Sequence, residues 1–372
     1  MPTREQNVLV LQGGGALGAY QAGAFQRLAE GERDIDWVAG ISIGAVNAAI
    51  ICGNPAENRV EKLKTFWKNV TSELAYTDWM WGPAPSQIHS ELAAAESALI
   101  GLPGFFRPRP FTTFWPFAAK LALSVYDTGP LEETLNELVD FEFLNDAGPR
   151  LSIGAVDIET GNFAYFDSSR IRIDVRHIMA SSALPPGFPP VEIDGRFYWD
   201  GGLVSNTPLQ YVMENAGTEP ICIFQIDLFS ARGELPANVS KVQEREKDIR
   251  YSSRTRLTTD RFRHLYEIRA AADRLTGKLP ENLRSDPDLA FLRAAGPSCP
   301  VTLVHLIRRN ERFGGGFKDY EFSRMSMVEH WTAGQADVDQ TLSHEEWKAR
   351  IVDKEGLQVF DLVQQANEGH RS

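Results

Sequence analysis

The sequence predicts an α/β fold in which helices cover both faces of a central, mainly parallel sheet. Short apolar runs typical of buried strands alternate with helix-like segments over roughly the first 230 residues. Each of the first two predicted strands leads through a glycine-containing turn into a helix, as in a β–α unit. The chain has 372 residues, and at about 150 residues per domain this length suggests two units. We expect a first domain over residues 1–235 and a mostly helical C-terminal extension over residues 236–372.

The predicted elements alternate regularly along the first domain. Apolar, β-branched runs indicate strands, and a helical spacing of apolar residues indicates helices. The strands are expected at Asn7–Leu11, Trp37–Ile41, Leu151–Asp157, Asn162–Phe166 and Pro220–Leu228, and the helices at Ala16–Glu30, Ser42–Cys52 and Leu131–Leu138.

Residues 66–126 differ in character from the rest of the first domain. Four of the eight tryptophans fall there, and six aromatic residues and three prolines between Phe105 and Phe117 interrupt any helix. We expect an insertion in the first domain. It either packs over the core or forms a lid with an apolar rim at the mouth of a binding site.

The charge distribution argues against a nucleic-acid-binding protein. The formal net charge is −12, whereas binding to phosphates requires a basic surface. Residues 1–240 carry 16 basic and 29 acidic side chains, and residues 241–372 carry 22 and 21. The locally basic stretch Lys241–Arg269 predicts a charged helix that lies on the domain or contacts a membrane surface.

The three cysteines, Cys52, Cys222 and Cys299, are too few and too scattered for a disulfide framework or a metal cluster. We therefore expect no metal and no cofactor. The polar N-terminus lacks the apolar stretch of a signal peptide, and no apolar run approaches the roughly 20 residues of a membrane span. These features favour a cytoplasmic protein.

The run Gly13-Gly14-Gly15-Ala16-Leu17-Gly18 follows the first predicted strand and opens a helix, as a dinucleotide-binding motif would. In that motif an acidic residue about 20 positions further on closes the second strand and binds the ribose. Here Asp34 and Asp36 precede the second strand instead. The sequence therefore disfavours a dinucleotide site.

The run Gly40-Ile41-Ser42-Ile43-Gly44 has the G-x-S-x-G pattern of a nucleophile elbow, and it lies between a predicted strand and a predicted helix. The two glycines permit a tight turn. The turn exposes the hydroxyl of Ser42 near the positive end of the helix. The pattern predicts Ser42 as a nucleophile.

A serine that attacks an ester also needs donors for the oxyanion that forms. Gly13, Gly14 and Gly15 end the neighbouring strand and can present backbone amides that no side chain obstructs. The amide of Ile43, at the start of the elbow helix, can add another donor. We expect these four residues to form an oxyanion hole.

None of the seven histidines lies in an evident catalytic motif, so the base that Ser42 needs must be sought elsewhere. Asp200 is the better candidate. It follows the apolar run Phe197–Trp199, and two glycines after it allow a close approach to another backbone. A buried carboxylate can activate a serine directly. From the residues alone, an ordinary Asp-Gly-Gly turn remains an alternative.

Four motifs together resemble the patatin-like phospholipase family, whose members use a Ser–Asp dyad. They are residues 13–18, 40–44, 180–185 (Ala-Ser-Ser-Ala-Leu-Pro) and 200–202, in the family's order. The resemblance covers about residues 7–210 and implies a three-layer α/β/α fold, with Ser42 and Asp200 as the dyad. Leu17 stands where many bacterial members carry a basic residue. This chain therefore lacks the charge that would hold an anionic head group at this position. The C-terminal residues, including 318–324 and 329–331, resemble the tail of a bacterial subgroup, and we interpret this tail as an oligomer contact or a wall of the acyl channel.

The resemblance implies a serine acyl hydrolase of phospholipase A or lipid esterase type that cleaves lipid esters through an acyl-enzyme. An acyltransferase with the same dyad and a non-catalytic lipid-binding or scaffold protein remain alternatives, as does, more remotely, an α/β-hydrolase with a histidine triad. The expected partner is a lipid or other ester, and not a nucleic acid. Peripheral membrane contact and a homo-oligomer are both compatible with the sequence.

Overall fold

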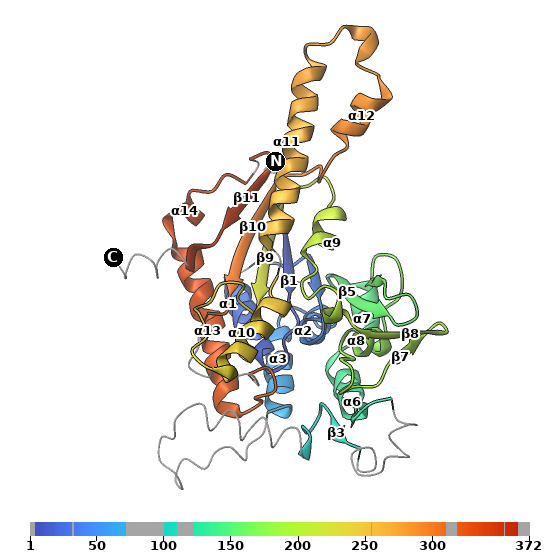
Figure 1. Cartoon of the computed structure of the whole chain (residues 1–372), viewed down its shortest axis with the longest axis vertical. Helices are drawn as coiled ribbons and strands as arrows, with labels where there is room; N and C mark the ends of the chain where they lie inside the picture. Colours follow the sequence, from blue (N-terminus) through green and yellow to red (C-terminus); the bar gives the residue numbers. More distant parts are fainter. Residues whose placement is uncertain are drawn as a thin grey trace.

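A central sheet lies between two layers of helices in the computed structural model, which describes residues 4–31, 33–71, 100–109, 123–253, 255–309, 318–352 and 354–363 (Figure 1). Within these residues the sheet has nine strands. Their spatial order is β11 (Leu357–Phe360), β10 (Val301–Ile307), β9 (Ile221–Asp227), β1 (Gln6–Leu11), β2 (Trp37–Gly40), β5 (Arg150–Asp157), β8 (Arg196–Asp200) and β7 (Val191–Ile193), and β6 (Phe163–Asp167) also pairs with β5.

The first six strands in this order, from β11 to β5, are parallel to one another. The pairs β5–β6, β5–β8 and β7–β8 are antiparallel. The predicted α/β fold with a mainly parallel sheet is therefore confirmed. A separate two-stranded sheet is formed by β3 (Arg107–Pro108) and β4 (Tyr126–Asp127).

Apolar side chains on both faces of the sheet pack against the two helical layers. One layer contains α1 (Ala19–Glu30), α2 (Ile43–Cys52), α3 (Arg59–Asn69), α6 (Gly129–Leu138), α7 (Phe141–Asp146), α8 (Val175–Ser181), α13 (Arg324–Ser343) and α14 (Glu345–Lys348). The other layer contains α9 (Leu209–Glu214) and α11 (Thr255–Thr276). Strands covered on both faces must be apolar on both faces, which explains their continuous apolar runs.

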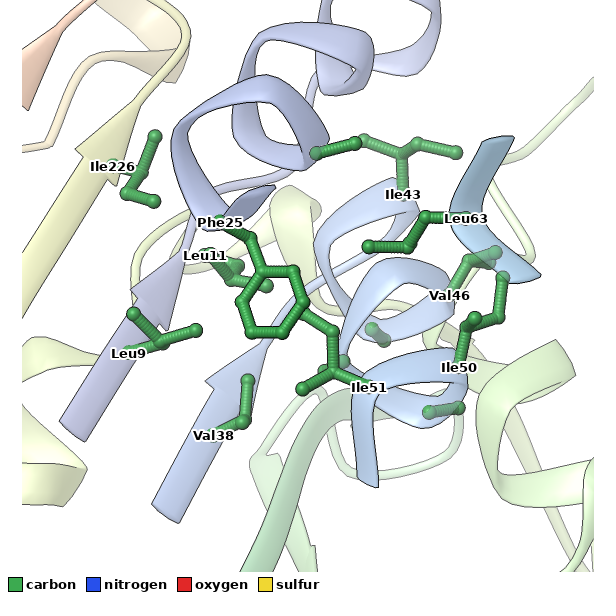
Figure 2. Packing of buried hydrophobic residues seen from close by; sticks show 14 of the residues in the cluster. Leu9, Leu11, Phe25, Val38, Ile43, Val46, Ile50, Ile51, Leu63 and Ile226 are labelled. Atoms are coloured by element: carbon green, nitrogen blue, oxygen red, sulfur yellow. The ribbon is translucent and has the colours of Figure 1, made fainter. Parts of the chain in front are cut away.

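Strand β1 illustrates this double burial. Leu9 and Leu11 face the layer that contains α1, whereas Val8 and Val10 face the layer that contains α11. Figure 2 shows the ring of Phe25, from α1, beside the two leucines and next to Ile51 of α2. These strand residues are fully buried, so the sheet positions the loops that follow its strands on a rigid support.

The C-terminal region is helical, as predicted, and it also completes the sheet. The basic stretch forms α10 (Val239–Tyr251) and most of α11, and α12 (Pro287–Arg293) returns beside α11, so that the two project from the body (Figure 1). The region adds β10, which pairs in parallel with β9, and β11, which pairs in parallel with β10. The division of the chain at residue 235 stays a prediction.

Most of the predicted insertion at residues 66–126 lies outside the described residues. The prediction that it forms a lid falls on those residues. Four of the insertion's described aromatic residues are buried. Phe66 and Trp67 on α3, and Phe105 and Phe106 before β3, belong to the core. Among the described residues, no helix is long and apolar enough to cross a membrane.

Candidate active site

Ser42 occupies the tight turn between β2 and α2. Its backbone has φ 55° and ψ −126°, a conformation that costs a residue with a side chain of the order of 1–3 kcal/mol. A Cβ on Gly40 would lie 2.4 Å from the carbonyl oxygen of Gly44, and a Cβ on Gly44 would lie 2.4 Å from that of Leu11. Only glycine fits at both positions, so the two glycines allow the strand and the helix to meet at this serine.

Ser42 and the carboxyl of Asp200 both line one cavity, and hydrogen bonding from the Ser42 hydroxyl lowers the pKa of that carboxyl. The carboxyl also accepts a hydrogen bond from the amide of Gly202, at 2.7 Å. Asp200 is 2 % exposed. Burial raises the pKa of its carboxyl to about 7, although the hydrogen bonds from Ser42 and Gly202 lower it in part. A carboxyl with such a pKa can both accept and return a proton near neutral pH.

Two strands that meet end to end explain why Ser42 and Asp200 are neighbours. Strand β2 runs parallel to β5 and ends where Gly40 pairs with Ile153. Strand β8 runs antiparallel to β5 from the other direction and ends where Asp200 pairs with Ala155. A single residue of β5 separates the two strand ends, and the residues that follow them converge there.

That single residue is Gly154, and a buried serine fills the gap beside it. The hydroxyl of Ser181 donates to the carbonyl oxygen of Gly154 at 2.7 Å and accepts from the amide of Ser42 at 3.0 Å. The hydroxyl of Ser182 donates to the carbonyl oxygen of Ser42 at 3.3 Å. The two serines therefore hold the strained Ser42 backbone on both sides of its side chain.

We expect Ser181→Ala to lower the free energy of unfolding by about 1–3 kcal/mol, because it leaves two buried backbone groups without partners. Urea denaturation measures this loss. Ser182→Ala, which removes the longer 3.3 Å hydrogen bond, is the matched control, and we expect it to cost less than about 1 kcal/mol. Equal losses in the two variants would contradict the bridging role of Ser181.

The glycine loop that follows β1 lies beside Ser42. A Cβ on Gly13 would lie 3.0 Å from the Cβ of Ser42. The amide of Gly13 donates to the carbonyl oxygen of Asn206 at 3.2 Å, and the Asn206 side chain donates to the carbonyl oxygen of Gly13 at 2.9 Å. In the described part of the chain, no acceptor binds the amides of Gly14, Gly15 or Ile43. These three amides could donate to a bound ligand, whereas the amide of Gly13, also predicted for the oxyanion hole, already donates to Asn206.

A cavity of about 650 Å³ contains the side chains of Ser42 and Asp200 in its wall. It lies at the carboxyl ends of the parallel strands, where the strand order reverses between β9 and β1. Such a switch point is the usual ligand site of an open α/β sheet. Most of the cavity wall is apolar, and its aromatic members are Phe105, Phe106, Tyr126, Phe188, Phe229, Tyr251, Tyr320 and Phe322.

One side of the cavity comes from the C-terminal region. Lys247 and Tyr251 on α10, and Asp319 and Tyr320 before α13, line it. Burial is the main cause that raises the pKa of Tyr251 and Tyr320, and the charges of Asp319 and Asp200 contribute. The charge of Asp200 therefore raises the pKa of both phenol groups.

The described histidines have structural surroundings outside the cavity. His177 forms a capping box with Asp174 at the start of α8. His305 lies on β10, where burial lowers its pKa to about 4. His330 accepts a hydrogen bond from Arg308. No described histidine lines the cavity, and the described residues contain no cluster of potential metal ligands.

Sequence reasoning missed Ser181, Asn206 and Lys247, whereas residues 318–324 were interpreted as an oligomer contact or a wall of the acyl channel, and Asp319, Tyr320 and Phe322 do line the cavity. The motif at residues 180–185 pointed to Ser181 only as part of a resemblance. Asn206 lies six residues after Asp200, and only its hydrogen bonds to Gly13 distinguish it. No local pattern marks Lys247, and Asp319 belongs to a stretch that was noted only as part of a resemblance.

A three-layer α/β/α protein with an apolar cavity at the carboxyl ends of its central strands is the class of molecule described so far. A family model for patatin-like phospholipases matches residues 9–213, more than half of the chain. The chain therefore belongs to the patatin-like phospholipase family, a family of lipid ester hydrolases. A second model, described as patatin phospholipase, matches residues 249–354.

Similar solved structures include VipD from Legionella pneumophila, with 13 % identity over 90 % of this chain and 66 % of that chain and a TM-score of 0.39. Human GIVD cytosolic phospholipase A2 has 13 % identity, coverage of 93 % and 60 %, and a TM-score of 0.41. ExoU, in complex with SpcU from Pseudomonas aeruginosa, has 15 % identity, coverage of 68 % and 51 %, and a TM-score of 0.26. The chain spans less than two thirds of the length of each of these proteins. No curated protein sequence matches it.

Proposed function

We propose that the chain is a serine acyl hydrolase that cleaves carboxylic ester bonds of lipids, with Ser42 as nucleophile and Asp200 as base. The observation that carries this proposal is that the strained Ser42 and the buried Asp200 follow strand ends that converge on β5 and line one apolar cavity. Membership in a family of lipid hydrolases supports it.

In the acylation half-reaction, the Ser42 oxygen attacks the ester carbonyl carbon while Asp200 takes the serine proton. The carbonyl oxygen becomes an oxyanion, which the amides of Gly14, Gly15 and Ile43 bind. When the tetrahedral intermediate collapses, the bond to the leaving alcohol breaks and Asp200 returns the proton to the alcohol oxygen. The acyl group is then esterified to Ser42.

In the deacylation half-reaction, Asp200 takes a proton from a water molecule, whose oxygen attacks the acyl carbon. The same amides bind the second oxyanion. The bond from the acyl carbon to the Ser42 oxygen then breaks, the serine recovers the proton from Asp200, and the fatty acid leaves. Both half-reactions thus use one carboxyl as acceptor and donor, which suits a pKa of about 7.

The proposal is tested with purified protein on a panel of phospholipids, lysophospholipids and neutral esters. We expect release of fatty acid, and labelling of Ser42 by a fluorophosphonate probe, with the modified peptide identified by mass spectrometry. If the folded protein shows no hydrolysis and no labelling, the proposal is contradicted. A non-catalytic lipid-binding protein is then the remaining interpretation. Transfer of the acyl group to an added alcohol in preference to water would identify an acyltransferase instead.

The aromatic wall predicts how the rate depends on acyl chain length. Phe188 contacts Phe105 and Phe106, with ring centroids 6.0 and 5.4 Å away. Each CH₂ buried against this wall can contribute up to about 0.8 kcal/mol. We expect Phe188→Ala to lower kcat/KM for long-chain p-nitrophenyl esters about 10-fold and to leave the acetyl ester within about twofold. An equal loss for both esters would contradict an acyl site at this wall.

A further inference from the structure

A short segment before α13, residues 318–322, lies against the glycine loop. The carbonyl oxygen of Asp319 accepts a hydrogen bond from the amide of Ala16 at 2.9 Å. Gly15 has a φ of +55°, and a Cβ at this position would lie 2.2 Å from the same carbonyl oxygen. The segment therefore contacts the loop at the residues that precede α1, and only glycine permits this approach.

Two ion pairs fix this segment to α10. The ammonium of Lys247 lies 2.5 Å from the carboxylate of Asp319, and that of Lys318 lies 2.5 Å from the carboxylate of Asp248. Adjacent residues on one segment thus pair with adjacent residues on the other, with opposite order of charge. All four side chains are at most 19 % exposed, and buried ion pairs of this kind hold their partners in one arrangement because an unpaired charge is costly there.

Helix α10 is in turn attached to the loops of the active site. The carbonyl oxygen of Tyr251, at its end, accepts hydrogen bonds from the side chains of Gln12 and Asn206 at 3.0 and 2.9 Å. Asn206 also binds Gly13. The C-terminal region thereby contacts the glycine loop at Gly13, through Asn206, and at Ala16, through Asp319.

The same region also packs against α1, the helix that follows the glycine loop. Helices α1 and α13 cross at two glycines. A Cβ on Gly23 would lie 1.9 Å from the carbonyl oxygen of Trp331, and one on Gly334 would lie 2.1 Å from that of Tyr20. The two helices are therefore packed closely, backbone against backbone, at these glycines.

We propose that the Lys247–Asp319 ion pair is a positioning device of the active site: it holds the Asp319 carbonyl on the Ala16 amide and so aims the amides of Gly14 and Gly15 at the oxyanion. The inference rests on the proposed function. It gives the C-terminal region a part in catalysis, because a segment about 300 residues beyond the loop sets the geometry of the oxyanion donors. Lys247 and Asp319 act here as positioning residues.

The test measures steady-state hydrolysis of a neutral p-nitrophenyl ester by full-length Lys247→Met and Asp319→Asn. We expect kcat to fall about 10- to 100-fold, because a shift of about 1 Å in a catalytic group costs this much, while KM changes less than about threefold. The double variant Lys247→Asp/Asp319→Lys restores the ion pair with reversed charge, and we expect it to recover at least about 10-fold of the lost kcat.

Asp273→Asn serves as control, because it breaks an ion pair of similar length with Arg293 on the projecting α11–α12 pair, at 2.6 Å. We expect its kcat to equal that of the wild type. Circular dichroism verifies that every variant is folded. If the wild type hydrolyses the ester and Lys247→Met keeps kcat within twofold, the positioning role is wrong. A loss confined to KM and to esters with anionic head groups would overturn it in favour of direct substrate binding by Lys247. An inactive wild type would refute the proposed function instead.

Discussion

Ser42→Ala is expected to lower ester hydrolysis by about 10⁴-fold or more, to the level set by binding and by the oxyanion donors alone. The substitution removes the oxygen that forms the acyl-enzyme. Alanine keeps a Cβ at the strained position, so the turn at φ 55° is neither relieved nor made worse. Steady-state kinetics and fluorophosphonate labelling measure the effect, and we expect no labelling of the variant.

Ser343→Ala provides the matched control, because this exposed serine at the end of α13 bonds only locally, to the carbonyl oxygen of Gln340. Its activity and labelling should equal those of the wild type. If folded Ser42→Ala retained more than about a hundredth of the activity, another nucleophile would have to be sought, and the dyad proposal would fail.

The elbow could be predicted from the sequence because its geometry is local. A strand, a turn with glycines at both sides and a helix are contiguous in the chain, and the close approaches at Gly40 and Gly44 are made by residues at most a few positions away or by the adjacent strand β1. The same holds for the glycine loop. Most strands of the sheet were also recognisable, since burial on both faces makes their apolar runs continuous.

The position of Asp200 beside Ser42 could not be derived from local pattern. It depends on β8 entering the sheet antiparallel and ending one residue short of β2 along β5. Strand pairing between distant segments leaves no trace in the composition of either segment. The residues alone therefore did not distinguish a catalytic Asp200 from the aspartate of an ordinary Asp-Gly-Gly turn. The resemblance to a family supplied what the residues alone did not.

The C-terminal contribution was the least predictable part. Strand β11 has four half-buried residues and gave no strong strand pattern. Lys247 and Asp319 are 72 positions apart, and each belongs to a charged stretch that is typical of a solvated surface. Only their burial and pairing against the glycine loop distinguish them, and both follow from the packing of α10 and α13 on the completed sheet.

Asp200→Asn is expected to lower kcat about 10³-fold at pH 8. The amide oxygen can still accept the hydrogen bond from the Ser42 hydroxyl, so the arrangement of the site is kept. An amide does not take up the serine proton, however. Kinetics with the same ester panel measure the loss. Wild-type turnover in this variant would rule out Asp200 as the base.

The pH dependence gives a sharper test of the same residue. Asp200 is a base only when it is deprotonated, and burial raises its pKa to about 7. In the wild type, kcat/KM should therefore rise about tenfold per pH unit below pH 7 and level off above it. The residual activity of Asp200→Asn should lack this limb. An identical limb in both proteins would assign it to another group.

The stability of Asp200→Asn should change in the opposite direction from its activity. The carboxyl titrates near pH 3.9 in the unfolded chain and near 7 in the folded protein. Between these values the folded protein binds more protons, so the wild-type free energy of unfolding falls as pH rises. Asparagine does not titrate, so the variant lacks this pH dependence. We therefore expect the variant to gain up to about 4 kcal/mol relative to the wild type between pH 4 and pH 8, measured by urea denaturation at both values.

A structural carboxylate would give the reverse result, because its removal would destabilise the protein most where it is ionised. A variant that loses turnover and gains stability at pH 8 would thus identify Asp200 as a charge buried for catalysis.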